Sequence, residues 1–152
     1  MVRQLHRKKL FIVTVESCTG GGLANAITNV AGASRVMAAG FITYSNRQKE
    51  MLGVPADLIE RHTVYSVEVA KSMAEAGLRN AVRADVGVGI TGSISRIDMT
   101  NPNSQRGVVY IAVRRGDSGI SKKIAVDDKG RRWEAKERII EEALRMVLKE
   151  ID

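Results

Sequence analysis

The sequence predicts an α/β fold, a three-layer α/β/α sandwich in which a mixed β-sheet lies between two layers of helices. Two observations lead to this prediction. Short β-branched apolar runs alternate along the chain with segments of helical periodicity. The last two apolar runs are separated by a short turn typical of a hairpin, so the sheet cannot be wholly parallel. The 152 residues, 44% of them hydrophobic, suffice to form one domain over residues 1–152.

The strands are predicted from continuous apolar runs. The first of them, LFIVTV, is short and rich in β-branched residues, as in a buried strand. In the third run, DVGVGIT, Gly87 and Gly89 indicate close packing of another backbone on the strand. In chain order, we expect strands at 10–15, 36–44, 85–91, 108–113 and 120–126. Residues 92–106 are polar and rich in turn formers, so we expect a loop there.

The helices are predicted from periodicity and caps. Ser66 is a good N-cap, and Glu68 in the following turn suits the helix dipole. The last segment of the chain places Ile139, Ala143 and Val147 on one side at helical spacing. In chain order, we expect helices at 23–30, 46–52, 56–62, 67–80 and 133–151.

The net charge of +7 suggests a partner that is anionic, but it is unevenly distributed. Residues 1–9 form a basic tail with four cations and no anion, and residues 114–138 carry nine cations and five anions. Residues 10–113 are nearly neutral. Aromatic residues do not alternate with basic ones, as they do in many single-strand binding surfaces. Nucleic acid is therefore a disfavoured partner, and the basic segments are either solvated surface or the rim of a site for an anion.

Several classes of site are disfavoured by composition. Cys18 is the single cysteine, which excludes an intramolecular disulfide and a cysteine-rich zinc site. His6 and His62 are the two histidines, so we expect no metal, no cofactor and no Ser-His-Asp triad. No apolar run approaches the roughly 20 residues of a membrane span. We expect a cytoplasmic protein without membrane contact.

The turn after the first strand is the segment best suited to chemistry. It reads Glu16-Ser17-Cys18-Thr19 and continues with three glycines that open a helix. Ligands of open α/β sheets bind at the carboxyl ends of strands, and backbone N–H groups at a helix N-terminus favour anions. Ser17 and Cys18 are candidate nucleophiles, although a serine requires a base and a lone cysteine is commonly a small buried apolar residue.

Tyr44 and Lys49 follow the second predicted strand and are candidates for that base. A lysine removed from water is neutral often enough to accept a proton. If Tyr44 ends the strand and Lys49 lies on the next helical turn, both point into one cleft. The alternative is that Tyr44 packs at the end of the strand and Lys49 is a surface cation.

Four sequence blocks resemble the CinA C-terminal domain family. Residues 16–21 match its E-S-C-T-G-G signature, and residues 43–54 resemble its T-Y-S-N-x-x-K…L-G-V block. Residues 66–74 resemble its S-x-x-V-A-x-x-M-A helix, and Thr91-Gly92 followed by 107–112 resembles its T-G…G-x-V-Y-I-A segment. The blocks occur in the family's order over about residues 10–113. On this resemblance, the chain is expected to be a divergent, stand-alone member of the family.

The resemblance implies an α/β/α nicotinamide-nucleotide amidase, a hydrolase of pyridine-nucleotide salvage and NAD metabolism. Such an enzyme converts nicotinamide mononucleotide and water into nicotinate mononucleotide and ammonia. The implied catalytic residues are Ser17 as nucleophile, with Lys49 taking its proton through Tyr44. The backbone N–H groups of residues 19–21 would hold the oxyanion. The resemblance also implies a small-molecule nucleotide partner and a homo-oligomer. Substrate contacts are expected from Glu16, Cys18, Thr19, Gly20, Gly21, Thr91, Gly92, Arg96 and Arg106.

The sequence departs from the family in the segment that should shape the nucleotide pocket. The family's G-I-A-G-P-x-G-G loop is replaced by residues 93–106, in which Arg96 and Arg106 are candidate phosphate contacts. The family's H-G-A-V-S reads His62-Thr63-Val64-Tyr65-Ser66 here. The alternative function is therefore a non-catalytic nucleotide-binding or regulatory module.

Overall fold

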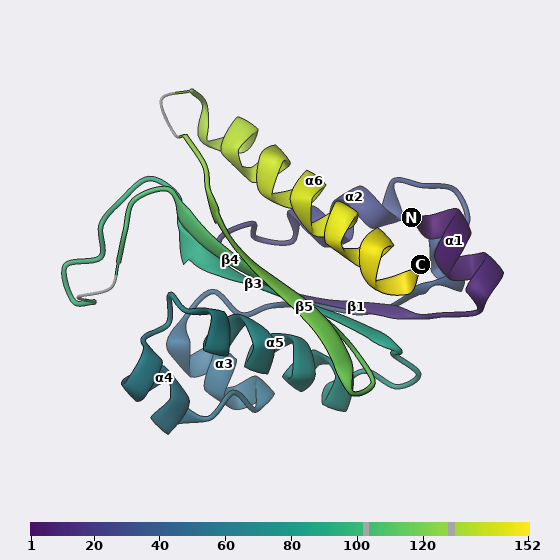
Figure 1. The fold of residues 1–152 in the computed structure, drawn as a ribbon, viewed down its shortest axis with the longest axis horizontal. Helices are drawn as coiled ribbons and strands as arrows, with labels where there is room; N and C mark the ends of the chain where they lie inside the picture. Colours follow the sequence, from purple (N-terminus) through teal and green to yellow (C-terminus); the bar gives the residue numbers. More distant parts are fainter. Residues whose placement is uncertain (102–103, 128–129) are drawn as a thin grey trace.

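A five-stranded mixed β-sheet forms the centre of the molecule, with strand order β2-β1-β3-β4-β5 (Figure 1). In this computed structural model, residues 1–101, 104–127 and 130–152 are described. β1 pairs in parallel with both β2 and β3, whereas β3-β4 and β4-β5 are antiparallel. The strands are β1 (Ile12–Glu16), β2 (Met37–Ile42), β3 (Val86–Ser93), β4 (Val108–Arg115) and β5 (Ser118–Ala125).

Helices cover both faces of this sheet, which confirms the predicted α/β/α sandwich (Figure 1). One layer contains α1 (Val2–Lys8), α2 (Gly22–Thr28) and α6 (Arg132–Ile151), and the other contains α3 (Asn46–Leu52), α4 (Ala56–His62) and α5 (Val67–Asn80). A short 3₁₀ helix, Ala33–Arg35, precedes β2. None of the helices in the described part of the chain combines the length and apolar composition required to cross a membrane.

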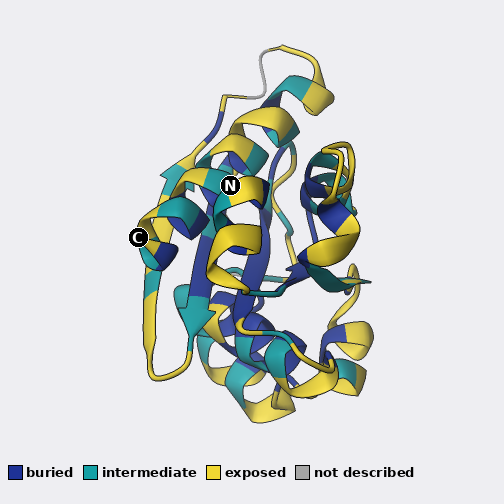
Figure 2. Cartoon of the chain, turned by 90° about the vertical axis from the view of Figure 1, so that its right-hand side faces the viewer, coloured by how far each residue is buried: buried dark blue, intermediate teal, exposed yellow. Residues whose placement is uncertain are grey.

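Two apolar clusters lie on the two sides of the sheet. The larger joins α1, α2 and α6 to the strands and includes Leu5, Ile27 and Ile139. The smaller lies under α4 and α5 and includes Ile59 and Met73. Buried residues accordingly concentrate along the central strands β1, β3 and β4 and on the inner sides of the helices, as Figure 2 shows. Because apolar burial is the main driving force of folding, these two clusters hold the three layers together.

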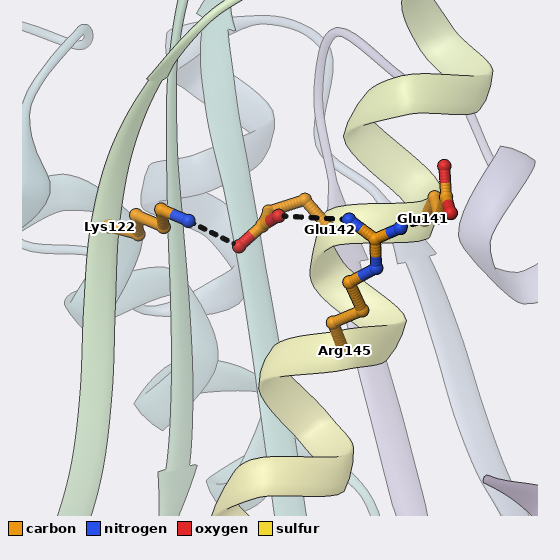
Figure 3. Close-up of polar contacts among 4 residues, drawn as sticks. All are labelled: Lys122, Glu141, Glu142 and Arg145. Atoms are coloured by element: carbon orange, nitrogen blue, oxygen red, sulfur yellow. Dashed lines mark hydrogen bonds and ion pairs between the residues drawn. The ribbon is translucent and has the colours of Figure 1, made fainter.

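Charged residues on the outer surface connect α6 to β5. Lys122 lies 2.7 Å from Glu142, and Arg145 bridges Glu142 and Glu141 (Figure 3). Most of these side chains are well exposed, and exposed ion pairs contribute about 0–1 kcal/mol each. The acidic end of the chain therefore neutralises part of the basic segment 114–138.

The predicted close packing at Gly87 and Gly89 is confirmed. A Cβ atom at Gly89 would lie 2.1 Å from the carbonyl oxygen of Ala70, and one at Gly87 would lie 2.4 Å from that of Ala74. Both carbonyls belong to α5, so the two glycines allow this helix to lie directly on β3. The contact fixes the first half of α5 against the first half of β3.

The prediction of a basic tail over residues 1–9 was wrong, because the structure places a helix there. In α1 the side chains of Val2 and Leu5 are buried, while its cations lie on the exposed side. Two apolar residues in seven are too few for a periodicity signal, and the dense charge obscured them. The other predicted elements are present, and their ends differ by three residues or fewer.

Candidate functional site

Ser17 is the first residue after β1 and lies at the carboxyl edge of the three parallel strands. Its backbone N–H donates to the carbonyl of Ile90 on β3 at 3.0 Å, which continues the sheet pairing by one residue. Its side chain is almost buried, with 8% of the residue exposed. Gly20 and Gly21 then adopt φ values of 63° and 91°, which side-chain-bearing residues rarely adopt. These glycines turn the chain sharply from β1 into α2.

Lys49 is the structure's strongest indication of chemistry at Ser17. It lies on α3, which Ser45 caps by accepting a hydrogen bond from the backbone N–H of Gln48. The lysine is only 1% exposed, and its Nζ donates to Ser17 Oγ at 3.2 Å and to the Thr43 carbonyl at 2.7 Å. Burial lowers the pKa of Lys49 from 10.5 to about 8. No acidic group among the described residues pairs with it, and a pKa of about 8 leaves roughly a tenth of the lysine neutral at about pH 7.

Tyr44 lines the same cavity, but it does not connect Lys49 to Ser17. It is 66% exposed, and among the described residues its hydroxyl forms no hydrogen bond. The expected relay from Ser17 through Tyr44 to Lys49 is therefore corrected: the lysine contacts the serine directly. The spacing of Tyr44 and Lys49 could not show this, because it does not fix which side chain turns inward.

Glu16 was expected to contact substrate, but its carboxylate is occupied within the fold. It is 1% exposed and accepts hydrogen bonds from the backbone N–H groups of Leu23 and Ala24, both at 2.9 Å. An acceptor placed there satisfies free donors of the first turn of α2 and interacts favourably with the helix dipole. The anion site predicted at this helix N-terminus is thus filled by the protein's own carboxylate.

Cys18 lines the cavity as a neutral thiol. Burial raises its pKa to about 12, and the opposing effects of its own backbone N–H and of Arg132 are smaller. Because the thiolate is the nucleophilic form, this cysteine is unreactive at neutral pH. Ser17 is the nucleophile that the geometry favours.

A cavity of about 960 Å³ opens beside Ser17 at the carboxyl edge of the sheet. The predicted site residues that line it are Ser17, Cys18, Tyr44, Lys49, Gly92 and Arg96. Those that do not line it are Glu16, Thr19, Gly20, Gly21, Thr91 and Arg106. The loop predicted at 93–106 forms part of the rim, and its residues 102–103 lie outside the described residues.

The backbone donors of the turn are only partly available. The N–H of Gly20 donates to the carbonyl of Ser17 at 3.1 Å, and that of Gly22 donates to Thr19 at 3.3 Å. Among the described residues, the N–H groups of Thr19 and Gly21 have no hydrogen-bond acceptor. The two donors are thus unpaired in the turn that follows Ser17, although neither residue lines the cavity.

Thr91 and Gly92 shape the cavity from behind. Thr91 is fully buried, and its hydroxyl donates to the carbonyl of Val64 at 2.9 Å, which ties the α4–α5 connection to β3. A Cβ atom at Gly92 would lie 2.6 Å from both the Val108 carbonyl oxygen and Val109 Cα. Thr91 therefore positions the segment that carries Tyr65, while Gly92 allows β3 and β4 to approach.

Sequence reasoning did not identify several cavity residues. Arg132, at the start of α6, donates to Ser95 Oγ at 2.9 Å. Tyr65 donates from its hydroxyl to Asp98 Oδ2 at 3.4 Å, and Glu60 also lines the cavity. The basic segment 114–138 gave a signal for Arg132, but nothing local distinguished it from neighbouring cations. Tyr65 and Asp98 are brought together across 33 residues.

Thr63 adopts an unusual backbone conformation at the cavity wall. Its φ of 63° and ψ of 160° lie in a region that is essentially restricted to glycine. Its hydroxyl oxygen is buried and, among the described residues, lacks a hydrogen-bond partner. Ser66 Oγ donates to the Thr63 carbonyl at 2.9 Å and accepts from the N–H of Val69, so the cap of α5 holds the strained residue in place.

A metal centre is not evident in the described residues, where no group of three or more His, Cys, Asp or Glu side chains could hold an ion. The cavity brings together a serine and a partly neutral lysine. This combination suits attack on a carbonyl carbon.

Comparison with family models matches residues 1–151 to the CinA C-terminal domain. A competence-damage inducible protein of Thermoanaerobacter sp. strain X514 is 37% identical over 148 residues, which are 97% of this chain and 35% of that protein. A CinA-like protein of Citrifermentans bemidjiense is 44% identical over 110 residues, or 72% of this chain and 26% of the relative. The chain therefore spans about a quarter to a third of the curated relatives it matches.

Solved structures give the same result. The competence/damage inducible protein CihA of Agrobacterium tumefaciens superposes with a TM-score of 0.88 at 31% identity, covering 97% of this chain and 89% of that one. A CinA superfamily protein of Escherichia coli superposes with a TM-score of 0.82 at 26% identity, covering 96% and 83%. The whole fold is shared with these proteins.

Proposed function

Because the chain belongs to the CinA C-terminal domain family, we propose that it is an amidohydrolase that deamidates nicotinamide mononucleotide. The products are nicotinate mononucleotide and ammonia. The observation that carries the proposal is the 3.2 Å contact between Ser17 Oγ and the buried Nζ of Lys49. This geometry, together with a lysine pKa of about 8, gives the serine a base within hydrogen-bond reach.

The first half of the reaction forms an acyl-enzyme. Neutral Lys49 accepts the hydroxyl proton as Ser17 Oγ attacks the carboxamide carbon. The carbonyl oxygen becomes an oxyanion, and the unpaired N–H groups of Thr19 and Gly21, in the turn after Ser17, are the donors proposed for it. Protonated Lys49 then delivers its proton to the amide nitrogen, the C–N bond breaks and ammonia leaves.

The second half regenerates the enzyme. A water molecule gives a proton to Lys49 and attacks the ester carbon through the same oxyanion position. The ester C–O bond to Ser17 breaks, Lys49 returns the proton to the serine, and the carboxylic acid product gives its remaining proton to solvent and is released as nicotinate mononucleotide. Lys49 thus acts alternately as base and acid, which requires a pKa close to the working pH.

Positive charge near the reactive residues supports a phosphorylated substrate. Arg132 and Arg96 line the cavity, and Arg132 is close enough to Cys18 to lower the pKa of its thiol. Lys136, one turn further along α6, places its Nζ 3.6 Å from where a Cβ on Gly20 would lie. A planar guanidinium such as that of Arg132 suits bidentate contact with a phosphate.

The alternative is a non-catalytic nucleotide-binding or regulatory module, and one observation favours it. Lys49 Nζ lies closer to the Thr43 carbonyl, at 2.7 Å, than to Ser17. A lysine that remains protonated would hold this carbonyl as a purely structural contact. Both functions require that the nucleotide binds in the cavity, but only the amidase releases ammonia from it.

The experiment is an ammonia-release assay with nicotinamide mononucleotide, using Ser17→Ala and, as matched control, Ser121→Ala on exposed β5. We expect Ser17→Ala to lose on the order of 1,000-fold or more in kcat, as other serine nucleophiles do, and the control to retain the wild-type rate. Binding of the nucleotide without ammonia release by the wild type would establish the regulatory alternative. Full activity of Ser17→Ala would contradict the assigned nucleophile.

A further inference from the structure

The cavity carries negative as well as positive charge. Asp98 and Glu60 line it together with Arg132, and in the part of the chain that the structure describes neither carboxylate pairs with a lysine or arginine. The pKa of Asp98 is held below its usual range by hydrogen bonds from the Thr100 hydroxyl and backbone N–H, so the group is ionised at neutral pH. A phosphate is an anion and would be repelled by these two carboxylates, so its recognition does not explain why they line the cavity.

The Asp98 carboxylate is held in place. Its Oδ1 accepts from Thr100 N at 3.0 Å and from Thr100 Oγ1 at 2.6 Å, and its Oδ2 accepts from the Tyr65 hydroxyl. The Asp98 backbone N–H donates to Ser104 Oγ at 2.8 Å. These contacts fix an anion at the cavity wall although the residue belongs to a loop.

Tyr65 connects this anion to the reactive end of the cavity. It follows Val64, whose carbonyl is anchored by buried Thr91, so its backbone is held against β3. The fields of Asp98, Tyr44 and Cys18 all contribute, after burial, to raising the pKa of Tyr65. Tyr65, Tyr44, Cys18 and Ser17 all line this one cavity, so the cavity that contains the nucleophile also presents two aromatic side chains.

We propose that Tyr65 and Asp98 select amides whose aromatic ring carries a positive charge, that is, quaternary pyridinium carboxamides. This inference rests on the proposed function, which places the carboxamide at Ser17. An aromatic face attracts a cation through its quadrupole, and a nearby unpaired carboxylate adds a direct charge attraction. The substrate would then lie with its anionic group toward Arg132 on α6 and its cationic ring toward the α4–α5 side.

Two small ligands isolate the ring charge from the sugar and phosphate. The 1-methylnicotinamide cation and neutral nicotinamide share the ring and the carboxamide and differ mainly in charge. Their dissociation constants can be measured by ligand-observed NMR on the full chain carrying Ser17→Ala, which prevents turnover. We expect the cation to bind about tenfold more tightly than the neutral amide.

The variants assign that preference to the two residues. With Asp98→Asn added, the dissociation constant of nicotinamide should exceed that of the cation by a factor of only about one to three. With Tyr65→Leu added, the tenfold preference should become about threefold smaller. The matched control, Asp117→Asn at the exposed β4–β5 turn, removes the same charge and should leave the ratio unchanged. Unfolding curves recorded for each variant exclude loss of the fold.

Several results would overturn the inference. They are equal binding of the two ligands, no binding of the cation, a preference that survives Asp98→Asn, or equal weakening of both ligands by that variant. If Asp98→Asn weakened nicotinamide mononucleotide alone, the carboxylate would contact the ribose hydroxyls instead of the ring. The proposed function fails separately, when the wild type binds the cation selectively but releases no ammonia from the nucleotide.

Discussion

The two sides of the cavity are built in different ways. The side that carries Ser17 and Lys49 follows regular structure, and both residues are buried where β1 ends and α3 turns inward. The side that carries Tyr65 and Asp98 consists of connections between elements, and Met99 next to Asp98 is 91% exposed. We call the first the reactive wall (Ser17, Thr43, Lys49) and the second the recognition wall (Tyr65, Asp98).

This difference separates two kinds of requirement. Proton transfer from Ser17 to Lys49 needs a fixed distance and a low dielectric, which buried sheet edges and helices provide. Recognition of charge tolerates looser geometry, because electrostatic attraction falls off gradually with distance. Changes in the reactive wall should therefore abolish turnover, and changes around the recognition wall should alter affinity or stability.

The largest effect is expected from Lys49→Met. Loss of the base should reduce kcat by on the order of 1,000-fold. The same change should raise Tm by several degrees, because the fold depresses the pKa of Lys49 by about 2.5 units and so loses about 3 kcal/mol of stability below pH 8. Ammonia release and thermal unfolding measure the two effects. The control is Lys71→Met, at an exposed position of α5. A variant that is less stable than the wild type and still active would contradict both the role of Lys49 as base and the destabilisation that we assign to its burial.

A second change tests the support of the reactive wall. Glu16→Gln replaces one acceptor oxygen by a donor that faces the N–H groups of Leu23 or Ala24. The lost charge-assisted hydrogen bond should lower the free energy of unfolding by about 2–3 kcal/mol. Urea denaturation monitors the change, and Glu50→Gln on exposed α3 provides the comparison. If the two variants were equally stable, Glu16 would not be the N-terminal support of α2.

Arg132→Met tests the cationic end of the cavity. Without the guanidinium, the KM for nicotinamide mononucleotide should rise about tenfold, because a charge-assisted contact with the phosphate is lost. The KM for the corresponding nucleoside, which lacks the phosphate, should change little. Arg138→Met, exposed on the same helix, controls for the change in net charge. An equal rise in KM for both substrates would place the phosphate elsewhere.

The smallest effect is expected from Thr63→Gly. Glycine adopts φ 63°, ψ 160° without the clash that threonine suffers, so relief of strain should raise stability by about 1 kcal/mol and Tm by about 2–4 °C. Lys9→Gly gives the comparison, because Lys9 has an ordinary left-handed conformation of φ 57°, ψ 35°. Differential scanning calorimetry of the pair should show the larger gain at residue 63. A lower Tm for Thr63→Gly would show that its side-chain packing outweighs the strain.

Most of the fold was predictable from local sequence. The apolar runs gave the strands, and Ser66 indicated the cap that begins α5. The α1 helix was not predictable, because two buried side chains among dense charge leave no clear period. Its stability comes from packing on the sheet, which depends on residues distant in sequence.

The site was predictable only as a set of candidate residues. Family resemblance indicated Ser17, Tyr44 and Lys49, but the direct contact of Lys49 with Ser17 depends on how α3 turns after β2. Glu16 looked like a ligand contact in sequence, and only the position of α2 shows that its carboxylate caps that helix. The Tyr65–Asp98 pair arises from two connections that meet in space and has no local signature.

The pH dependence of kcat/KM for ammonia release tests most directly the claim that Lys49 is the base for Ser17. Protonated Lys49 cannot accept the serine proton, so activity should fall about tenfold per pH unit below about pH 8 and level off above it. The residual rate of Lys49→Met should lack this ionisation. A wild-type profile that is flat between about pH 6 and about pH 9, or the same ionisation in Lys49→Met, would contradict the mechanism.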